Sequence, residues 1–463
     1  MTEEFSLLLA SGLIYLLFAG GYMFWNLSKL SVEALMVGYT LYASLILVEI
    51  DFGPASPRVW MIFLLFAWAI IRIANRQYNP QIWNVLKPMI IVWFFFTIWT
   101  NFCDFGHGRV DLNFQVFGYL NNKLSKFAVP IMACISFAVL LKRANDIRYV
   151  IFVSISTIVA SVFVAYLQFF DLEIGWEIHR KLRPITVAVE EILKGRTMMD
   201  GHITGLSGRS VQFAYTLITF GIFSFSYVLI KERGSKIAYW LGLLAFGCIA
   251  LAAFLAKSRS GMLAFVFSGL AAWVLPFRLY SGFRPHKTIF GIFMLGAALF
   301  AVLLVLKGQD AFKYENFDRM GSFDDRYRIY QAQLAVESTI RNPVIGIGIQ
   351  EYTQKYELPP HNLFLNAMVY YGVPGLLFSF AHIIALFFIY KWYKREIFGM
   401  TDISWISFGC ILAMFNYTWN SMTHNDSFIT GGTFLYYIIG IFAASAALEL
   451  MKEEDGRQAL PYR

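Results

Sequence analysis

The chain has 463 residues, of which 58% are hydrophobic, 18% aromatic and only 15% charged. A soluble domain has about 25% charged residues, so the composition excludes a water-soluble protein and indicates a polytopic membrane protein. The 38 lysines and arginines exceed the 30 acidic residues and give a net charge of +8. Basic residues in short cytoplasmic loops explain this excess without nucleic-acid binding.

Apolar runs long enough to cross a membrane follow one another along the chain. A spanning helix needs about 20 mostly apolar residues, and about thirteen runs reach that length. The first run follows the acidic start 1–4, which lacks the basic segment of a secretory signal, so we expect it to be retained. The runs lie near 5–25, 31–50, 58–75, 86–102, 127–142, 148–170, 209–230, 237–256, 260–280, 288–307, 361–391, 401–421 and 429–450. We predict an all-α fold with about 12–13 transmembrane helices in a single integral membrane domain that covers 1–463.

The charges of the short loops predict the orientation of these spans. Alternate loops are rich in lysine and arginine, which makes their side cytoplasmic. Two long polar segments, about 171–208 and 308–360, then lie on the outer face, and so does the N-terminus in this count. The basic residues of the loops predicted to be cytoplasmic are Arg72, Arg76, Lys87, Lys142, Arg143, Arg148, Lys231, Arg233, Lys236, Arg278, Arg284, Lys287, Lys391, Lys394, Arg395, Lys452 and Arg457.

Two short basic elements fall on the predicted outer face. Lys257-Ser258-Arg259-Ser260 separates two apolar runs, and Arg209 stands at the head of the span 209–230. Cations here oppose the orientation bias, and polar groups inside membrane proteins often mark a site. These cations could instead anchor their helices by reaching lipid headgroups.

The second long outer segment contains a predicted helix. Asp324 or Asp325 can cap its start, and Arg341-Asn342-Pro343 would stop it. The two aspartates could instead hold a metal ion, although capping is the more common use of such residues. After the stop, Gly346-Ile347-Gly348 predicts a sharp turn.

One face of this helix gathers three polar side chains. Arg326, Tyr330 and Gln333 are spaced i, i+4 and i+7, so they lie on the same side. Ile329, Leu334 and Val336 make the helix moderately amphipathic.

A histidine stands where the outer loop becomes a long apolar helix. Proline suits the first turn of a helix, so Pro359-Pro360 predicts His361 within that turn, at the outer aqueous boundary. The positive end of the helix dipole favours neutral imidazole, which has a nitrogen free to accept a proton. A histidine that only caps the helix is the alternative. Further on, Gly372-Val373-Pro374-Gly375 predicts a kink.

In this order, the motifs resemble those of the O-antigen ligase and polymerase superfamily of bacterial membrane glycosyltransferases. The resemblance covers roughly Gly205 to Leu377. Family members have cytoplasmic termini, which differs from the outward N-terminus counted above. The matching elements are Gly205-Leu206-Ser207-Gly208-Arg209, Ser258-Arg259-Ser260-Gly261, Arg326-xxx-Tyr330-xx-Gln333-Leu334, Asn342 to Gly348, His361-Asn362-xx-Leu365 and Tyr371 to Gly375.

The resemblance implies transfer of a glycan from undecaprenyl diphosphate to an acceptor hydroxyl at the outer face of the bacterial inner membrane. The acceptor is lipid A-core for a ligase or another lipid-linked glycan for a polymerase. No cofactor is expected: the diphosphate already activates the donor, so no nucleotide is needed, and the cations can take the place of a metal ion. The four cysteines, Cys103, Cys134, Cys248 and Cys410, show no paired spacing that would indicate a metal cluster or a disulfide framework.

The roles of individual residues follow from the same reading. Arginine's planar fork matches phosphate oxygens, so the diphosphate-binding candidates are Arg259, Arg326, Arg209 and Lys257. His361 is the candidate general base of an inverting displacement, and Tyr330 and Asn362 are supporting residues. A lipid-linked oligosaccharide flippase is the alternative function. A peptidoglycan glycosyltransferase would instead need a catalytic carboxylate from 324–325.

Overall fold

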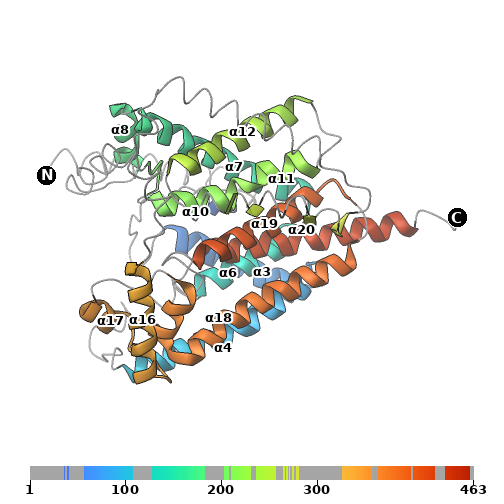
Figure 1. Cartoon of the computed structure of the whole chain (residues 1–463). Coiled ribbons are helices and arrows are strands. Elements are labelled where there is room, and N and C mark those ends of the chain that lie inside the picture. Colours follow the sequence, from blue (N-terminus) through green and yellow to red (C-terminus); the bar gives the residue numbers. More distant parts are fainter. Residues whose placement is uncertain are drawn as a thin grey trace.

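We describe a computed structural model of the chain, which is built of α-helices (Figure 1). No β-strand occurs in the residues that it describes. Those residues are 36, 39–40, 57–107, 128–170, 172–182, 203–207, 210–230, 236–256, 264–265, 267–268, 271, 274–275, 278–280, 326–356, 360, 362–397, 400–422 and 433–458.

The helices confirm the predicted all-α polytopic membrane fold. Six of them within the described ranges are long and apolar enough to cross a membrane, and two shorter ones are also apolar. The elements are α3 (Pro57–Ala74), α4 (Ile82–Gly106), α6 (Val129–Leu140), α7 (Ala144–Phe169), α8 (Glu173–Leu182), α10 (Ser210–Phe220), α11 (Ile222–Ile230), α12 (Lys236–Leu255), α16 (Arg326–Arg341), α17 (Ile349–Tyr356), α18 (Leu363–Glu396), α19 (Ser404–Ser421) and α20 (Thr433–Gln458).

Most predicted spans coincide with these helices, within a few residues at each end. The span predicted at 209–230 consists of two helices, α10 and α11, which meet at Gly221. A side chain at Gly221 would lie 2.5 Å from Ile249 Cγ2, so the close packing of α12 against this point requires glycine. The predicted spans 5–25 and 288–307 lie outside the described residues, as do nearly all of 31–50 and part of 260–280.

The interior of the bundle is formed by α10, α11, α19 and α20. In the apolar membrane-length stretch of α20, 83% of the residues are buried, whereas in those of α4 and α18 only 33% are buried. α20 packs against α6 and α19, while α4 and α18 run side by side along the edge of the bundle (Figure 1). Phe94 and Phe387 on these edge helices are largely exposed. This outer surface therefore suits contact with lipid chains.

Buried polar groups connect the helices near the far end of α18. The Glu449 carboxylate on α20 is fully buried and accepts hydrogen bonds from the hydroxyls of Tyr393, at 2.7 Å, and Ser404. Tyr280 and Tyr393 share a further hydrogen bond of 2.9 Å between their hydroxyls. Because an unpaired polar group inside a membrane protein is costly, these contacts tie α18, α19 and α20 together.

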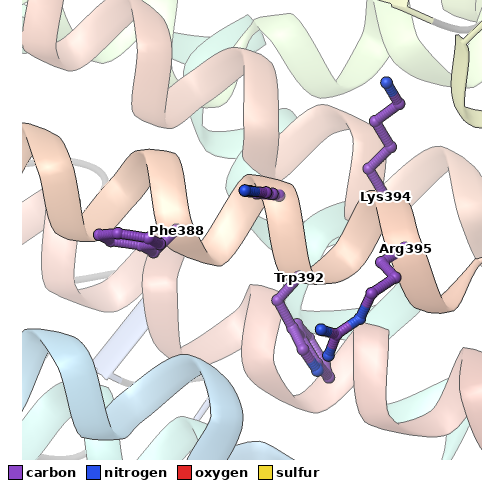
Figure 2. Close-up of a pocket in the computed structure, with 5 residues that line it drawn as sticks. Phe388, Trp392, Lys394 and Arg395 are labelled. Carbon is purple, nitrogen blue, oxygen red and sulfur yellow. The ribbon is translucent and has the colours of Figure 1, made fainter.

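Basic residues of the predicted loops that the structure describes lie at this same end, which we call the cationic end. Asp402 forms ion pairs with Arg148, at the start of α7, and with Lys452, near the end of α20. Asn79, just before α4, donates to Ala447 O at 3.1 Å. The last turns of α18 add more basic residues, and Figure 2 shows Arg395 beside the Trp392 ring, with Lys394 pointing away. The opposite end of the bundle is the site end.

Candidate functional site

At the site end, α16 and α17 lie across the beginning of α18 (Figure 1). α16 begins at Arg326 and ends at Arg341, which confirms the predicted helix and its stop before Pro343. Its face toward the protein is formed by small and polar residues, including Gln331, Ala335 and Ser338. The α16 helix is therefore fixed to the bundle by close backbone approach.

The outward face of α16 contains the predicted polar group. Tyr330 is 55% exposed and Gln333 is also exposed, as their shared spacing predicts. Arg326 opens the helix one turn before Tyr330, and its side chain lies outside the described residues. Ile329 and Val336, which the amphipathic pattern would bury, are exposed beside this face instead.

α17 packs against α16 through its tyrosines. The Tyr352 hydroxyl donates to Gln331 O at 3.3 Å, and the Tyr352 ring is fully buried. The Ser338 hydroxyl hydrogen-bonds the Tyr356 side chain and lowers the pKa of this phenol, and the nearby charges of Lys355 and Arg341 act in the same direction. The two helices thus form one unit that covers the start of α18.

α18 begins later than predicted. Asn362 is the N-cap, because its side-chain oxygen accepts from Phe364 N at 2.8 Å and Leu365 N at 3.2 Å. His361 therefore precedes the helix instead of standing in its first turn, and it lies outside the described residues. Asparagine is among the best N-caps, and this preference sets the boundary after the two prolines.

The Asn362 side chain has a second partner, because its Nδ2 donates to Met422 O at 2.8 Å, just past the end of α19. A single side chain thus fixes the start of α18 to the end of a neighbouring helix. The contacts of Asn362 are thus structural, and its supporting role in the site stays a prediction.

The predicted kink in α18 is confirmed at Gly372, whose φ of 68° and ψ of −163° are not helical. The break frees backbone groups of α18, and the loop after α16 satisfies them. Ile347 N and Gly348 N both donate to Val369 O at 3.0 Å, and Val373 N donates to Pro343 O at 2.8 Å. We call this contact between 342–348 and 369–373 the interlock.

Two glycines make the interlock possible. Gly346 and Gly372 have φ values of 70° and 68°, which glycine adopts readily and other residues do not. A Cβ on Gly372 would overlap Val344 O and lie 2.5 Å from Pro343 O, and one on Gly346 would lie 2.9 Å from Gly372 N. The glycines of the two predicted motifs therefore serve one contact.

Two ring N–H groups of α4 and its C-terminal end complete the interlock. Trp99 Nε1 donates to Tyr371 O at 3.0 Å. His107 Nε2 lies 3.0 Å from Gly346 O and must carry its hydrogen, because a carbonyl can only accept. The motif search missed both residues, since the first half of the chain shows no family motif. The sequence feature that could have indicated them is a pair of rings with N–H groups near the end of an apolar run.

A second group of hydrogen bonds holds segment 203–207, which precedes Arg209 in the sequence. The Gln168 amide oxygen accepts from two backbone N–H groups of this segment, at 3.0 and 3.2 Å, and its Nε2 donates to Gly205 O at 3.2 Å. Ser161 accepts a further N–H at 3.0 Å, and His179 Nε2 donates to a carbonyl of the segment at 3.2 Å. Residues from α7 and α8 thus position 205–207, the first part of the matching element that ends at Arg209.

The structure places only part of the predicted site. Tyr330 and Asn362 are described, and both are at the site end. Arg326 is described as the first residue of α16, without its side chain. In the described ranges, no three His, Cys, Asp or Glu side chains are grouped to hold a metal ion. The residues outside those ranges are His361, Arg209, Arg259, Lys257, Asp324 and Asp325.

The arrangement defines an all-α polytopic membrane protein with a folded loop unit docked on a kinked helix. Residues 243–380 of the chain match the family described as O-antigen ligase. This match supports the membership of the chain in the O-antigen ligase and polymerase superfamily, as the motifs predicted. The matched range includes α16, the interlock and the start of α18. A search of curated proteins gave no match.

Proposed function

We propose that this protein transfers a glycan from undecaprenyl diphosphate to an acceptor hydroxyl, as an O-antigen ligase or as an O-antigen or exopolysaccharide polymerase. The family match supports a transferase of this general type. The observation that carries the finer proposal is the interlock, because it joins the Arg326 helix to the helix that follows His361.

The leaving diphosphate needs cations that tolerate a membrane boundary. Arg326 begins α16, on the side of the helix where Tyr330 and Gln333 are exposed. Arg259, Arg209 and Lys257 would complete the diphosphate site, since arginine's fork matches phosphate oxygens. As the bond between the anomeric carbon and the phosphate oxygen breaks, these cations would stabilise the growing negative charge.

The acceptor hydroxyl needs a base. His361 directly precedes the N-cap of α18, where the first-turn N–H groups favour neutral imidazole. In this proposal His361 takes the hydroxyl proton while the oxygen attacks the anomeric carbon from the face opposite the diphosphate. The configuration is therefore inverted, and general-base help of this kind contributes about 10²–10⁴-fold.

The orientation of the chain would bring donor and site together. The positive-inside rule makes the cationic end cytoplasmic, so the site end would face the periplasm. Single cysteines at Ser322 and Gln350 should then react with impermeant thiol reagents applied to intact spheroplasts, whereas one at Lys394 should not. The reversed pattern would contradict the proposed orientation.

The test of the chemistry uses purified full-length protein with lipid-diphosphate glycan and acceptor. His361→Ala should reduce transfer by about 10²–10⁴-fold, with an unchanged melting temperature. Arg326→Lys should also be strongly impaired, because it keeps the charge but loses the fork. Arg341→Lys, at the other end of α16, is the matched control and should remain active. Near-normal turnover of His361→Ala would remove this histidine from the mechanism.

The same assay separates the two subclasses. A ladder of longer chains formed from the lipid-linked repeat alone would identify a polymerase. Product formed only after lipid A-core is added would identify a ligase. Movement of the lipid-linked glycan between leaflets without any new glycosidic bond would instead favour a flippase.

A further inference from the structure

A recess at the cationic end is distant from the proposed reaction. It is a cavity of about 570 Å³ between the turn after α3, the start of α4, the end of α6 and residues 444–451 of α20. Four separate elements therefore build its walls.

Two cationic side chains line this cavity. Arg76 and Lys142 come from different loops. Burial lowers the pKa of Lys142, and the nearby charge of Arg72 lowers it further. No carboxylate in the described ranges forms an ion pair with Arg72, Arg76 or Lys142. An anion in the cavity would offset the mutual repulsion of these cations.

Apolar side chains also line the cavity. They include Val139 of α6, Leu141 just after it and Ala447 of α20. Leu448 and Met451 extend this surface along α20. The cavity therefore offers cations beside a hydrocarbon-like surface at the edge of a membrane protein. A small inorganic anion would use only the first of these features, whereas a phospholipid would use both.

The backbone at Arg76 is an independent sign that this side chain has a use. Arg76 has a φ of 54°, and it is the one non-glycine residue with positive φ in the described part of the chain. It ends α3 with Gln77 N donating to Arg72 O at 2.8 Å. Glycine is the usual residue in this left-handed position after a helix, and a strained residue is a reason to look for function.

We infer that this cavity binds the headgroup of an anionic phospholipid, with the phosphate between Arg76 and Lys142 and acyl carbons along the apolar side chains of the lining. Basic pockets between transmembrane helices suit such headgroups. This inference does not depend on the proposed transferase function, because the cavity lies at the opposite end of the bundle.

The basic surface in Figure 2 provides a comparison. Lys391, Lys394 and Arg395 line a recess of about 470 Å³ with Phe388 and Trp392, all from the last turns of α18. A recess on a single exposed helix suits the general contact of any membrane protein with basic and aromatic residues at the lipid boundary. The positive-inside rule accounts for it without a specific ligand.

The experiment measures phospholipid binding to the full-length protein in detergent by native mass spectrometry. Phosphatidylglycerol, phosphatidylethanolamine and inorganic phosphate are titrated separately. Each juxtamembrane cation contributes about fivefold to anionic-lipid affinity, so Arg76→Gly and Lys142→Gln should each weaken phosphatidylglycerol binding about fivefold and the double variant roughly 25-fold. Binding of phosphatidylethanolamine should change little.

Two controls make the result decisive. Glycine fits the left-handed turn, so Arg76→Gly removes the side chain without harming the fold and should melt at or above the wild-type temperature. Lys391→Gln combined with Lys394→Gln should leave phosphatidylglycerol affinity nearly unchanged. Wild-type affinity in the Arg76→Gly, Lys142→Gln protein would overturn the inference. So would binding of inorganic phosphate with no preference for phosphatidylglycerol over phosphatidylethanolamine, because the anion would then not be a lipid.

Discussion

The interlock makes Gly372 the most sensitive position for a small substitution. Gly372→Ala adds one methyl group where φ is 68° and where that carbon would lie 2.5 Å from Pro343 O. Both the residue and the backbone opposite are constrained, because Val373 N and Val369 O are bonded to the same loop. The loop 342–348 must therefore move away from α18.

The magnitude follows from what is lost. The backbone of Gly372, with φ of 68° and ψ of −163°, lies in a region that is essentially restricted to glycine and costs another residue about 1–3 kcal/mol. Each of the three interlock hydrogen bonds contributes about 1 kcal/mol. A local destabilisation of about 4 kcal/mol raises the population of the open loop by about 10³-fold. The transmembrane helices should stay folded, because the small cluster under the loop, formed by Ala335, Ile347, Tyr352, Val369 and Tyr370, is separate from the main core.

Hydrogen exchange measured by mass spectrometry tests this directly. Amides of 342–350 should exchange about 10³ times faster in Gly372→Ala, while those of α20 should not change. Transferase activity should fall in parallel, because α16 loses its position relative to α18. Gly242→Ala is the matched control, since Gly242 lies inside α12 and alanine there would meet only side-chain atoms, of Val228 at 3.1 Å and of Tyr227 at 3.3 Å. Wild-type exchange of 342–350 in Gly372→Ala would refute the interlock.

Three further outcomes are expected. His107→Ala should destabilise the protein by about 1–3 kcal/mol, because Gly346 O loses its donor; His107→Gln, which can still donate, should recover part of the melting temperature. Burial raises the pKa of Asp402, but hydrogen bonds and charges from Lys452 and Arg148 outweigh this effect and lower the pKa below 3.8. The stabilisation of the folded protein by these two ion pairs should therefore be lost only as the pH falls through that lower pKa. Melting temperatures of wild type and Asp402→Asn should therefore differ near neutral pH and converge in acid. Transfer should persist in excess EDTA; loss of turnover that magnesium restores would instead support a metal site at 324–325.

Local patterns in the sequence determined the elements of this protein. Runs of about 20 apolar residues can only be helices in a membrane, and most of the predicted spans that fall in the described ranges are helices. Arg341-Asn342-Pro343 stops α16, and Gly372 with Pro374 breaks α18, because glycine and proline act on their own backbone. The motifs also predicted the family, which the match to 243–380 supports.

Tertiary structure alone decided how these elements are joined. The carbonyls freed at the kink find donors in Ile347, Gly348 and Trp99, and no periodic pattern connects residues so distant in the chain. The start of α18 depends on which of several adjacent residues accepts hydrogen bonds from the N–H groups of the first turn. The Asn362 side chain does so.

The face that α16 buries could not be read from its hydrophobic pattern. Gln331 is only 4% exposed, whereas Ile340 is 71% exposed. In a soluble protein, apolar residues turn inward because water surrounds the fold. At a membrane boundary the exterior can itself be apolar, so hydrophobicity no longer distinguishes inside from outside. Close packing against α17 and α18 then decides which side of the helix is buried.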